Sequence, residues 1–180
     1  MGAMAGTVEQ DLGSIVESAV EGDEVAFGSI VAAYQDQMYC LCVVVCRDRS
    51  LAEEAVQSAW SRIWQGLGAL READKLRPWV MSVAVNEAKS LLRRRRRRAG
   101  VEMLADPYDG PGGIDPATGI AAIDLRDAMR RLDPDDRALL TMRYVLGFDA
   151  TELSTAFGLS PSGTRTRLER LLARLRRELD

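Results

Sequence analysis

The residues best suited to hold a charged partner are arginines, and the densest group of them forms one unbroken run. Six arginines occupy positions 93–98 within the stretch SLLRRRRRRAG. Each guanidinium keeps its positive charge and presents several N–H donors, which suits phosphate oxygens. Cations also stabilise a helix C-terminus, but one or two would be enough for that. The run therefore favours binding to a nucleic-acid backbone. A localisation signal is the least favoured alternative, because the run continues an amphipathic helix.

A second group of cations lies near the C-terminus, in SPSGTRTRLERLLARLRREL. A short helix, a glycine-containing turn at 158–160 and a longer basic helix form a helix-turn-helix pattern. The first residues of the second helix in such a pair enter the DNA major groove, where arginine can pair with guanine edges or phosphates. The candidate DNA-binding side chains are Arg165, Thr166, Arg167 and Arg170. The opposite, core-facing stripe consists of Leu168, Leu171, Leu172 and Leu175.

Several kinds of catalytic and metal chemistry are excluded because the 180 residues include no histidine. Nucleophiles activated by histidine cannot form. The three cysteines, Cys40, Cys42 and Cys46, lack a histidine that could complete a zinc site. We expect them to be small apolar side chains of a buried helix, with metal binding or redox sensing as the minor alternative. The sequence predicts neither an enzyme nor a bound metal or cofactor.

The net charge of −3 conceals an uneven distribution. Residues 1–92 carry −6, residues 93–98 carry +6, residues 99–120 carry −4 and residues 121–180 carry +1. Such segregation suggests separate surfaces for separate partners. The N-terminus lacks a basic start followed by an apolar run, and no apolar stretch approaches the length of a membrane span. We therefore expect a soluble, cytoplasmic chain.

Apolar residues recur with helical spacing along most of the chain, so the predicted fold class is all-α. Asp23, Ser50, Asp133 and Asp149 are predicted helix caps, and Pro78 falls in the first turn of its helix. Gly66 and Gly68 end a helix, and the stretch GALREADKL after it is predicted to be a loop. The expected helices cover 7–21, 24–37, 37–47, 51–67, 77–98, 120–132, 134–148, 150–157 and 161–179.

One segment divides the helices into two groups. Residues 101–119 hold three prolines and four glycines and are acidic, so they cannot bury a core. The sequence thus predicts two small helical modules, at 8–98 and 120–180, joined by a flexible acidic linker at 99–119.

An acidic row opens the helix after Ser50. Glu53, Glu54 and Gln57 face away from the apolar stripe that contains Val56 and Trp60. They could form a docking face for a basic partner, or they could stabilise the helix N-terminus through its dipole. The sequence favours neither alternative.

Four stretches in this order carry a resemblance to a known family. They are GDEVAFGSIVAAYQDQMY, SLAEEAVQSAWSRIWQGL, LRPWVMSVAVNEAKSLLRRRRRR and LDPDDRALLTMRYVLGFDATELSTAFGLS. Together they resemble the extracytoplasmic-function (ECF) sigma factors of bacterial RNA polymerase, within the sigma-70 family. The resemblance covers about residues 20–98 and 120–178. It implies a dissociable subunit that recognises promoter −35 and −10 elements and melts the −10 element.

The resemblance also implies roles for individual residues. Glu53, Glu54 and Gln57 would bind the clamp helices of the polymerase β′ subunit, and the flap of β would be a second contact. The −10 element would be bound by Lys75, Asn86, Lys89, Arg93, Arg94 and Arg97. Loop 68–76 would hold a flipped base, the acidic linker would thread through the polymerase, and Arg165, Thr166, Arg167 and Arg170 would read the −35 element. An anti-sigma factor is an expected partner.

Two departures from the family pattern affect sequence preference. SPSGTRTRL places a glycine inside the first turn of the recognition helix, and LREADKL lacks the usual aromatic-and-glycine loop. The rival hypothesis is a stand-alone helix-turn-helix regulator, whose N-terminal module senses a ligand or dimerises. Such a regulator would bind its operator without polymerase.

Overall fold

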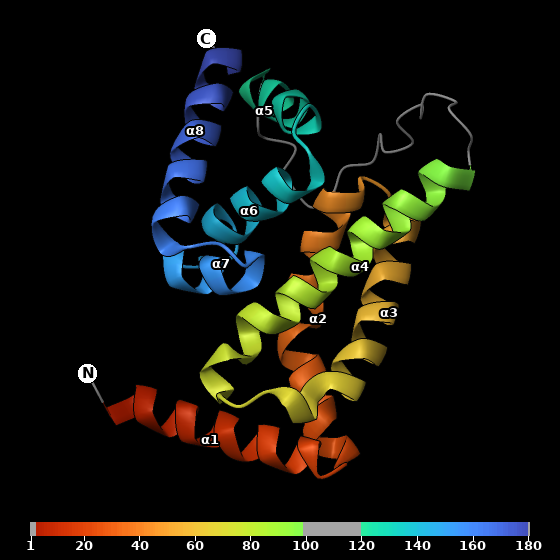
Figure 1. Cartoon of the computed structure of the whole chain (residues 1–180), viewed down its shortest axis with the longest axis vertical. Helices are drawn as coiled ribbons and strands as arrows, with labels where there is room; N and C mark the ends of the chain where they lie inside the picture. The colour runs from red at the N-terminus through yellow and green to blue at the C-terminus, as the bar shows by residue number, and fades with distance from the viewer. Residues whose placement is uncertain (1–2, 99–119, 180) are drawn as a thin grey trace.

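The computed structural model describes residues 3–98 and 120–179, and side chains within 12–98 and 125–179. This described part is all-helical and contains no strand, which confirms the predicted class (Figure 1). The first group of elements is α1 (Ala3–Val20), α2 (Glu24–Cys46), α3 (Arg49–Gly66), the 3-10 turns η1 (Leu67–Ala69) and η2 (Ala73–Lys75), and α4 (Leu76–Arg98). The second group is α5 (Ile120–Arg130), α6 (Pro134–Tyr144), α7 (Ala150–Phe157) and α8 (Pro161–Leu179). The predicted linker at 99–119 lies outside the described residues.

Helix α2 is the central element of the first module, and it is a single helix where the sequence predicted two. Asp23 caps it by accepting hydrogen bonds from the N–H groups of Val25 and Ala26. No glycine or proline interrupts the predicted junction at Gln37, so nothing breaks the helical ladder there. The β-branched residues near its end are tolerated because Val45 is fully buried in the core.

By length and composition alone, α2 could also cross a membrane, which the sequence expectation did not allow for. Its apolar face is instead packed against α3, α4 and α6. Its most buried side chains are Ile30, Met38, Leu41, Cys42 and Val45. A core helix passes the same composition test, so α2 is explained by its place in the core.

The N-terminal ends of α3 and α4 are set by local sequence signals. Helix α3 is capped by Asp48, whose carboxylate accepts from the N–H of Leu51 at 3.0 Å; the predicted cap, Ser50, lies inside the helix. Helix α4 begins at Leu76, so Pro78 falls in its first turn as predicted, where a missing N–H costs nothing. From there α4 runs 23 residues, roughly 34 Å at 1.5 Å per residue.

Two of the three cysteines are buried as expected, and the expectation is wrong for Cys40. Cys42 and Cys46 share the buried face of α2, and Cys40 is exposed. The Cys42 thiol donates to the carbonyl oxygen of Ala84, 3.7 Å away. Burial raises the pKa of both buried thiols, that of Cys46 to about 12.

The second module contains the predicted helix-turn-helix. Asp133 caps α6, and Asp149 caps α7 in a reciprocal capping box with Glu152. Gly158 ends α7 with φ of 64°, a left-handed conformation that glycine adopts without strain. Helix α8 buries Leu168, Leu171 and Leu175. The turn therefore sets α8 with its leucine stripe inward and its other face toward solvent.

The two modules pack directly against each other. Helix α6 lies on α2, and α7 lies on α4 (Figure 1). The sequence did not predict this contact, because the linker between the modules suggested independent units.

Candidate nucleic-acid interface

The outer face of α8 carries three of the four predicted −35 residues in exposed positions. Arg165, Thr166 and Arg170 are exposed, opposite the buried leucine stripe. The Arg165 guanidinium is held close to its own helix, since Nε donates to the carbonyl oxygen of Pro161 at 3.3 Å. An exposed, basic, N-terminal part of the second helix is the geometry that enters a major groove.

Arg167, the fourth predicted −35 residue, points elsewhere. Its Nε and Nη2 lie 2.8 Å and 2.6 Å from Oδ1 of Asp136 on α6. Burial raises the pKa of Asp136, while the guanidinium of Arg167 acts in the opposite direction. The pair connects α8 to α6. The other three predicted −35 residues do not contact Asp136 in this way.

Two further residues on the outer face were missed by the sequence analysis. Ser162 and Glu169 are both exposed and share the outward face of α8 with Thr166. The spacing of three and four residues around Thr166 was a readable signal. Neither residue carries a positive charge, which was the property used to predict DNA contacts. Serine and glutamate also contact base edges.

The arginine run at the end of α4 is mostly free to meet a partner. Arg93, Arg94, Arg96, Arg97 and Arg98 are exposed. Arg95 is half-buried and forms an ion pair with Asp48, the cap of α3. Burial alone would raise the pKa of Asp48, but hydrogen bonds from Leu51 and Arg95 outweigh it and lower the pKa. One arginine of the run therefore fastens α4 to α3, while its neighbours project from the surface.

Among the remaining predicted −10 residues, Lys75 lies apart from Asn86 and Lys89, which are neighbours on α4. Lys75 is exposed in η2, and its Nζ lies 2.5 Å from Oε1 of Glu72, a contact that raises the pKa of Lys75. Asn86 is exposed at the middle of α4, and Lys89 is half-buried one turn further on. Residues 76–92 of α4 separate Lys75 from the arginine run.

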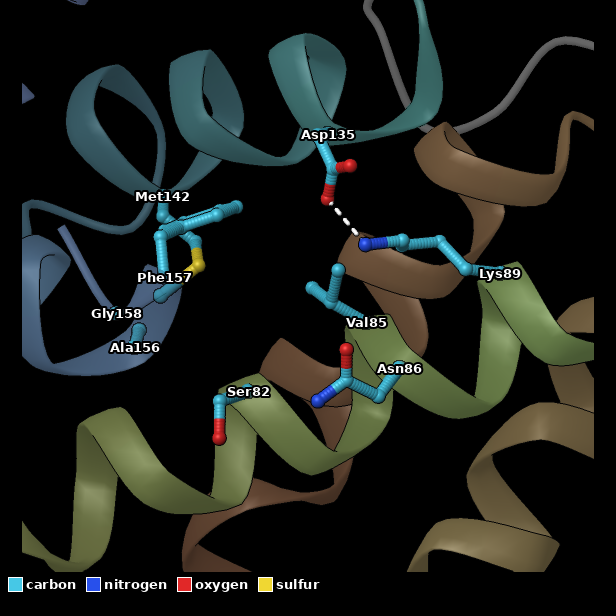
Figure 2. Close-up of a pocket in the computed structure, with 9 residues that line it drawn as sticks. All are labelled: Ser82, Val85, Asn86, Lys89, Asp135, Met142, Ala156, Phe157 and Gly158. Atoms are coloured by element: carbon cyan, nitrogen blue, oxygen red, sulfur yellow. Dashed lines mark hydrogen bonds and ion pairs between the residues drawn. The ribbon is translucent and has the colours of Figure 1, made fainter.

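A cleft of about 280 Å³ separates the middle of α4 from α6 and α7 (Figure 2). Asn86 lines it from α4, and Nζ of Lys89 reaches across to Oδ1 of Asp135, 2.6 Å away. The other lining residues are Ser82, Val85, Met142, Ala156, Phe157 and Gly158. Two predicted −10 residues therefore face the second module of their own chain.

The acidic row on α3 is exposed as predicted. Glu53, Glu54 and Gln57 point to solvent, while Ala52 and Val56 point into the core. A groove of about 370 Å³ runs beside this row and joins it to the arginine run. It is lined by Leu51, Glu54, Leu91, Arg94, Arg95 and Arg98. Acidic and basic surfaces thus meet at one end of the first module.

Loop 67–75 is supported from below by α1, which contacts both η1 and η2. Leu67 is buried, and Val16 and Ala19 of α1 are buried too. An ideal Cβ on Gly66 would lie 3.3 Å from the ring of Trp79, so the glycine lets Trp79 pack closely at the end of α3.

Within the described residues no group of three potential metal ligands occurs.

The comparisons with known proteins agree with this architecture. The family model of Sigma-70 region 2 matches residues 30–98, and that of Sigma-70, region 4 matches residues 122–175. The chain is 29% identical over 185 residues to a probable RNA polymerase sigma factor, RfaY, of Xanthomonas campestris pv. campestris; the match covers 97% of this chain and 46% of that protein. This chain thus spans about half the length of RfaY.

Two further proteins align with most of this chain over most of their own length. The chain is 25% identical over 174 residues to the ECF RNA polymerase sigma factor SigM of Mycobacterium tuberculosis, covering 97% of this chain and 87% of SigM. The solved structure of the sigma factor RpoE in complex with the anti-sigma factor NepR, from Bartonella quintana, has a TM-score of 0.66 at 19% identity. It covers 85% of this chain and 96% of that one.

The fold is that of a two-module, all-helical protein with a helix-turn-helix in its second module. The chain belongs to the sigma-70 family, in its ECF group, whose members are RNA polymerase sigma factors that direct transcription. The rival hypothesis of a stand-alone regulator is not favoured, because the first module matches region 2 of a sigma factor.

Proposed function

We propose that this sigma factor recognises promoters through two separate surfaces, the outer face of α8 for the −35 element and α4 for the −10 element. The observation that supports this most directly is the exposure of Arg165, Thr166 and Arg170 opposite a buried leucine stripe. Five exposed arginines at the end of α4 supply a phosphate-binding surface. The functional units are residues 8–98 and 120–180, with 99–119 as the connecting linker.

The exposed acidic row on α3 is the proposed polymerase contact. Glu53, Glu54 and Gln57 would bind the clamp helices of the β′ subunit, and the second module would bind the flap of β. Support comes from the separation of charge, since this row is acidic and exposed while the proposed DNA surfaces are basic. The polymerase performs the chemistry, so the chain itself is not an enzyme, and it works in the cytoplasm.

An anti-sigma factor is the proposed regulator. Support comes from the likeness of this fold to RpoE, which was solved in complex with the anti-sigma factor NepR. Such a partner would compete with the polymerase for the same sigma surfaces.

Run-off transcription tests the proposed function. Core polymerase with this chain should give a discrete transcript from a cognate promoter fragment, and the chain alone should give none. Charge reversal at Glu53 and Glu54 should abolish the transcript by preventing assembly, as measured by co-elution with core. Equal output with and without the chain would overturn the proposal.

A further inference from the structure

We propose that Glu169 of α8 reads a cytosine in the −35 element, and that the exposed arginines beside it hold the DNA backbone. This inference rests on the proposed role of the outer face of α8 in −35 recognition. The base-reading residue is thus a carboxylate, where the sequence predicted arginines and a threonine.

The part of α8 that can enter a groove is the part that faces away from the protein. Helices α5, α6 and α7 all contact α8, and they lie on one side of it (Figure 1). At 3.6 residues per turn, four exposed residues fall within an arc of about 60° opposite the buried leucine stripe. This outward strip consists of Ser162, Thr166, Glu169 and Ala173. When α8 enters the major groove along this strip, these four side chains meet the base edges.

The arginines in the first half of α8 lie beside the outward strip and not within it. Arg165 and Arg170 each fall about 70° from the middle of the strip, on opposite sides. Nε of Arg165 donates to the carbonyl oxygen of Pro161 at 3.3 Å, which holds this side chain along the flank of the helix. Arg167 is paired with Asp136 on α6. Guanidinium groups on the two flanks are placed for the phosphates that border the groove.

Glu169 carries the charge least suited to a phosphate, and its carboxylate is available for another partner. Among the side chains within 12–98 and 125–179, none forms a hydrogen bond or an ion pair with Glu169. The other glutamate of α8, Glu178, is engaged, since its Oε1 lies 3.0 Å from Nε of Arg174. Phosphates repel a carboxylate at close range. The oxygens of Glu169 are therefore suited to a hydrogen-bond donor on a base edge.

The pattern of donors and acceptors in the major groove selects the base. Cytosine presents an amino donor at N4 and no acceptor of its own. Adenine presents its amino donor beside N7, an acceptor that repels a carboxylate, whereas guanine and thymine present acceptors. A carboxylate on the outward strip therefore favours cytosine over the other three bases.

Selection from a promoter library by the holoenzyme tests this inference. The library keeps the −10 element of a cognate promoter and carries random bases across the −35 region, and the retained duplexes are sequenced. The wild type should enrich cytosine at one position. Glu169→Gln should enrich adenine there instead, because glutamine bonds N6 and N7 of adenine together. Glu169→Ala should lose the preference at that position, a fall in cytosine enrichment of about tenfold.

Glu17→Gln is the matched control, because it makes the same change of charge at an exposed position of α1. It should leave the cytosine preference unchanged, and circular dichroism checks that every variant keeps the helix content of the wild type. Arg170→Ala should lower the retention of all sequences alike, since phosphates carry no sequence information.

The outcomes separate this inference from the proposed function. A −35 preference without cytosine, or a cytosine preference that persists in both Glu169 variants, would overturn the role of Glu169 and leave the proposed function intact. A wild-type holoenzyme with no base preference across the −35 region would overturn the proposed −35 recognition, and the role of Glu169 with it.

Discussion

Nε of Arg62 on α3 lies 2.7 Å from Oε1 of Glu87 on α4, and the Glu87 side chain is only 4% exposed while that of Arg62 is 65% exposed. A nearly buried carboxylate is thus neutralised by a cation that reaches in from solvent. Glu87 directly precedes Ala88 on the buried face and follows the exposed Asn86. The pair thus joins α3 to α4 on the turn that carries Asn86.

Arg62→Gln should lower the free energy of unfolding by about 1–3 kcal/mol, because it leaves a buried charge without its partner. Adding Glu87→Gln should restore much of that loss, since the charge is then gone as well. Urea denaturation followed by circular dichroism measures both. Arg71→Gln, at an exposed loop position, is the control and should change stability by less than about 0.5 kcal/mol. Equal effects of the Arg62 and Arg71 variants would contradict this role.

The three thiols should react at very different rates. Burial raises the pKa of all three thiols, but the side chains of Cys42 and Cys46 are buried whereas that of Cys40 is exposed. Since the thiolate is the reactive form, a maleimide at pH 7.5 should modify one thiol quickly and the other two only on unfolding. Mass spectrometry with and without urea counts the adducts. Rapid modification of Cys42 in the folded chain would show that the closed core opens readily.

Local features were the most predictable from the sequence. The caps at Asp133 and Asp149, the turn at Gly158 and the leucine stripe of α8 all follow from rules that act within a few residues. The contacts between modules were not predictable in this way. Arg137 and Val45 are 92 positions apart, and the helical pattern shows which face of each helix is polar but not which polar faces meet. The pairing of Arg167 with Asp136 was unpredictable for the same reason, since the two residues are 31 positions apart.

The stability of the first module should depend on pH through Asp48. Hydrogen bonds from Leu51 and Arg95 hold its pKa below the usual value, although burial opposes them. A depressed carboxyl pKa stabilises the fold fully above the unfolded-state value of about 4, and the contribution is lost as pH falls through the folded-state pKa. Asp48→Ala should thus cost about 1 kcal/mol at pH 7 and less at pH 3. The measurement is urea unfolding at both pH values. An equal cost at the two pH values would contradict the assignment.

Replacing Arg167 should mainly reduce stability, whereas replacing Arg170 should mainly reduce promoter binding. Arg167→Ala removes the tie to Asp136 and should lower the unfolding free energy by about 1 kcal/mol, because the pair is partly shielded from solvent. Arg170→Ala removes an exposed side chain and should leave stability unchanged while weakening promoter binding by the holoenzyme. Thermal unfolding and a holoenzyme mobility shift measure the two effects. A loss of stability in the Arg170 variant, or none in the Arg167 variant, would reverse these roles.

The arginine run should act as a phosphate clamp. Arg94 and Arg97 are exposed, so replacing both with alanine should weaken promoter binding by the holoenzyme and flatten its dependence on salt. Each lost phosphate contact lowers the slope of log affinity against log salt by about 0.9, so the double variant should lose about 1.8. Sequence preference should change little, because phosphates carry no sequence information. Arg95→Ala is the informative comparison, since Arg95 is bound to Asp48 and its loss should reduce stability more than the salt slope. A shift in promoter preference in the Arg94/Arg97 variant, with an unchanged slope, would show that these arginines read bases instead.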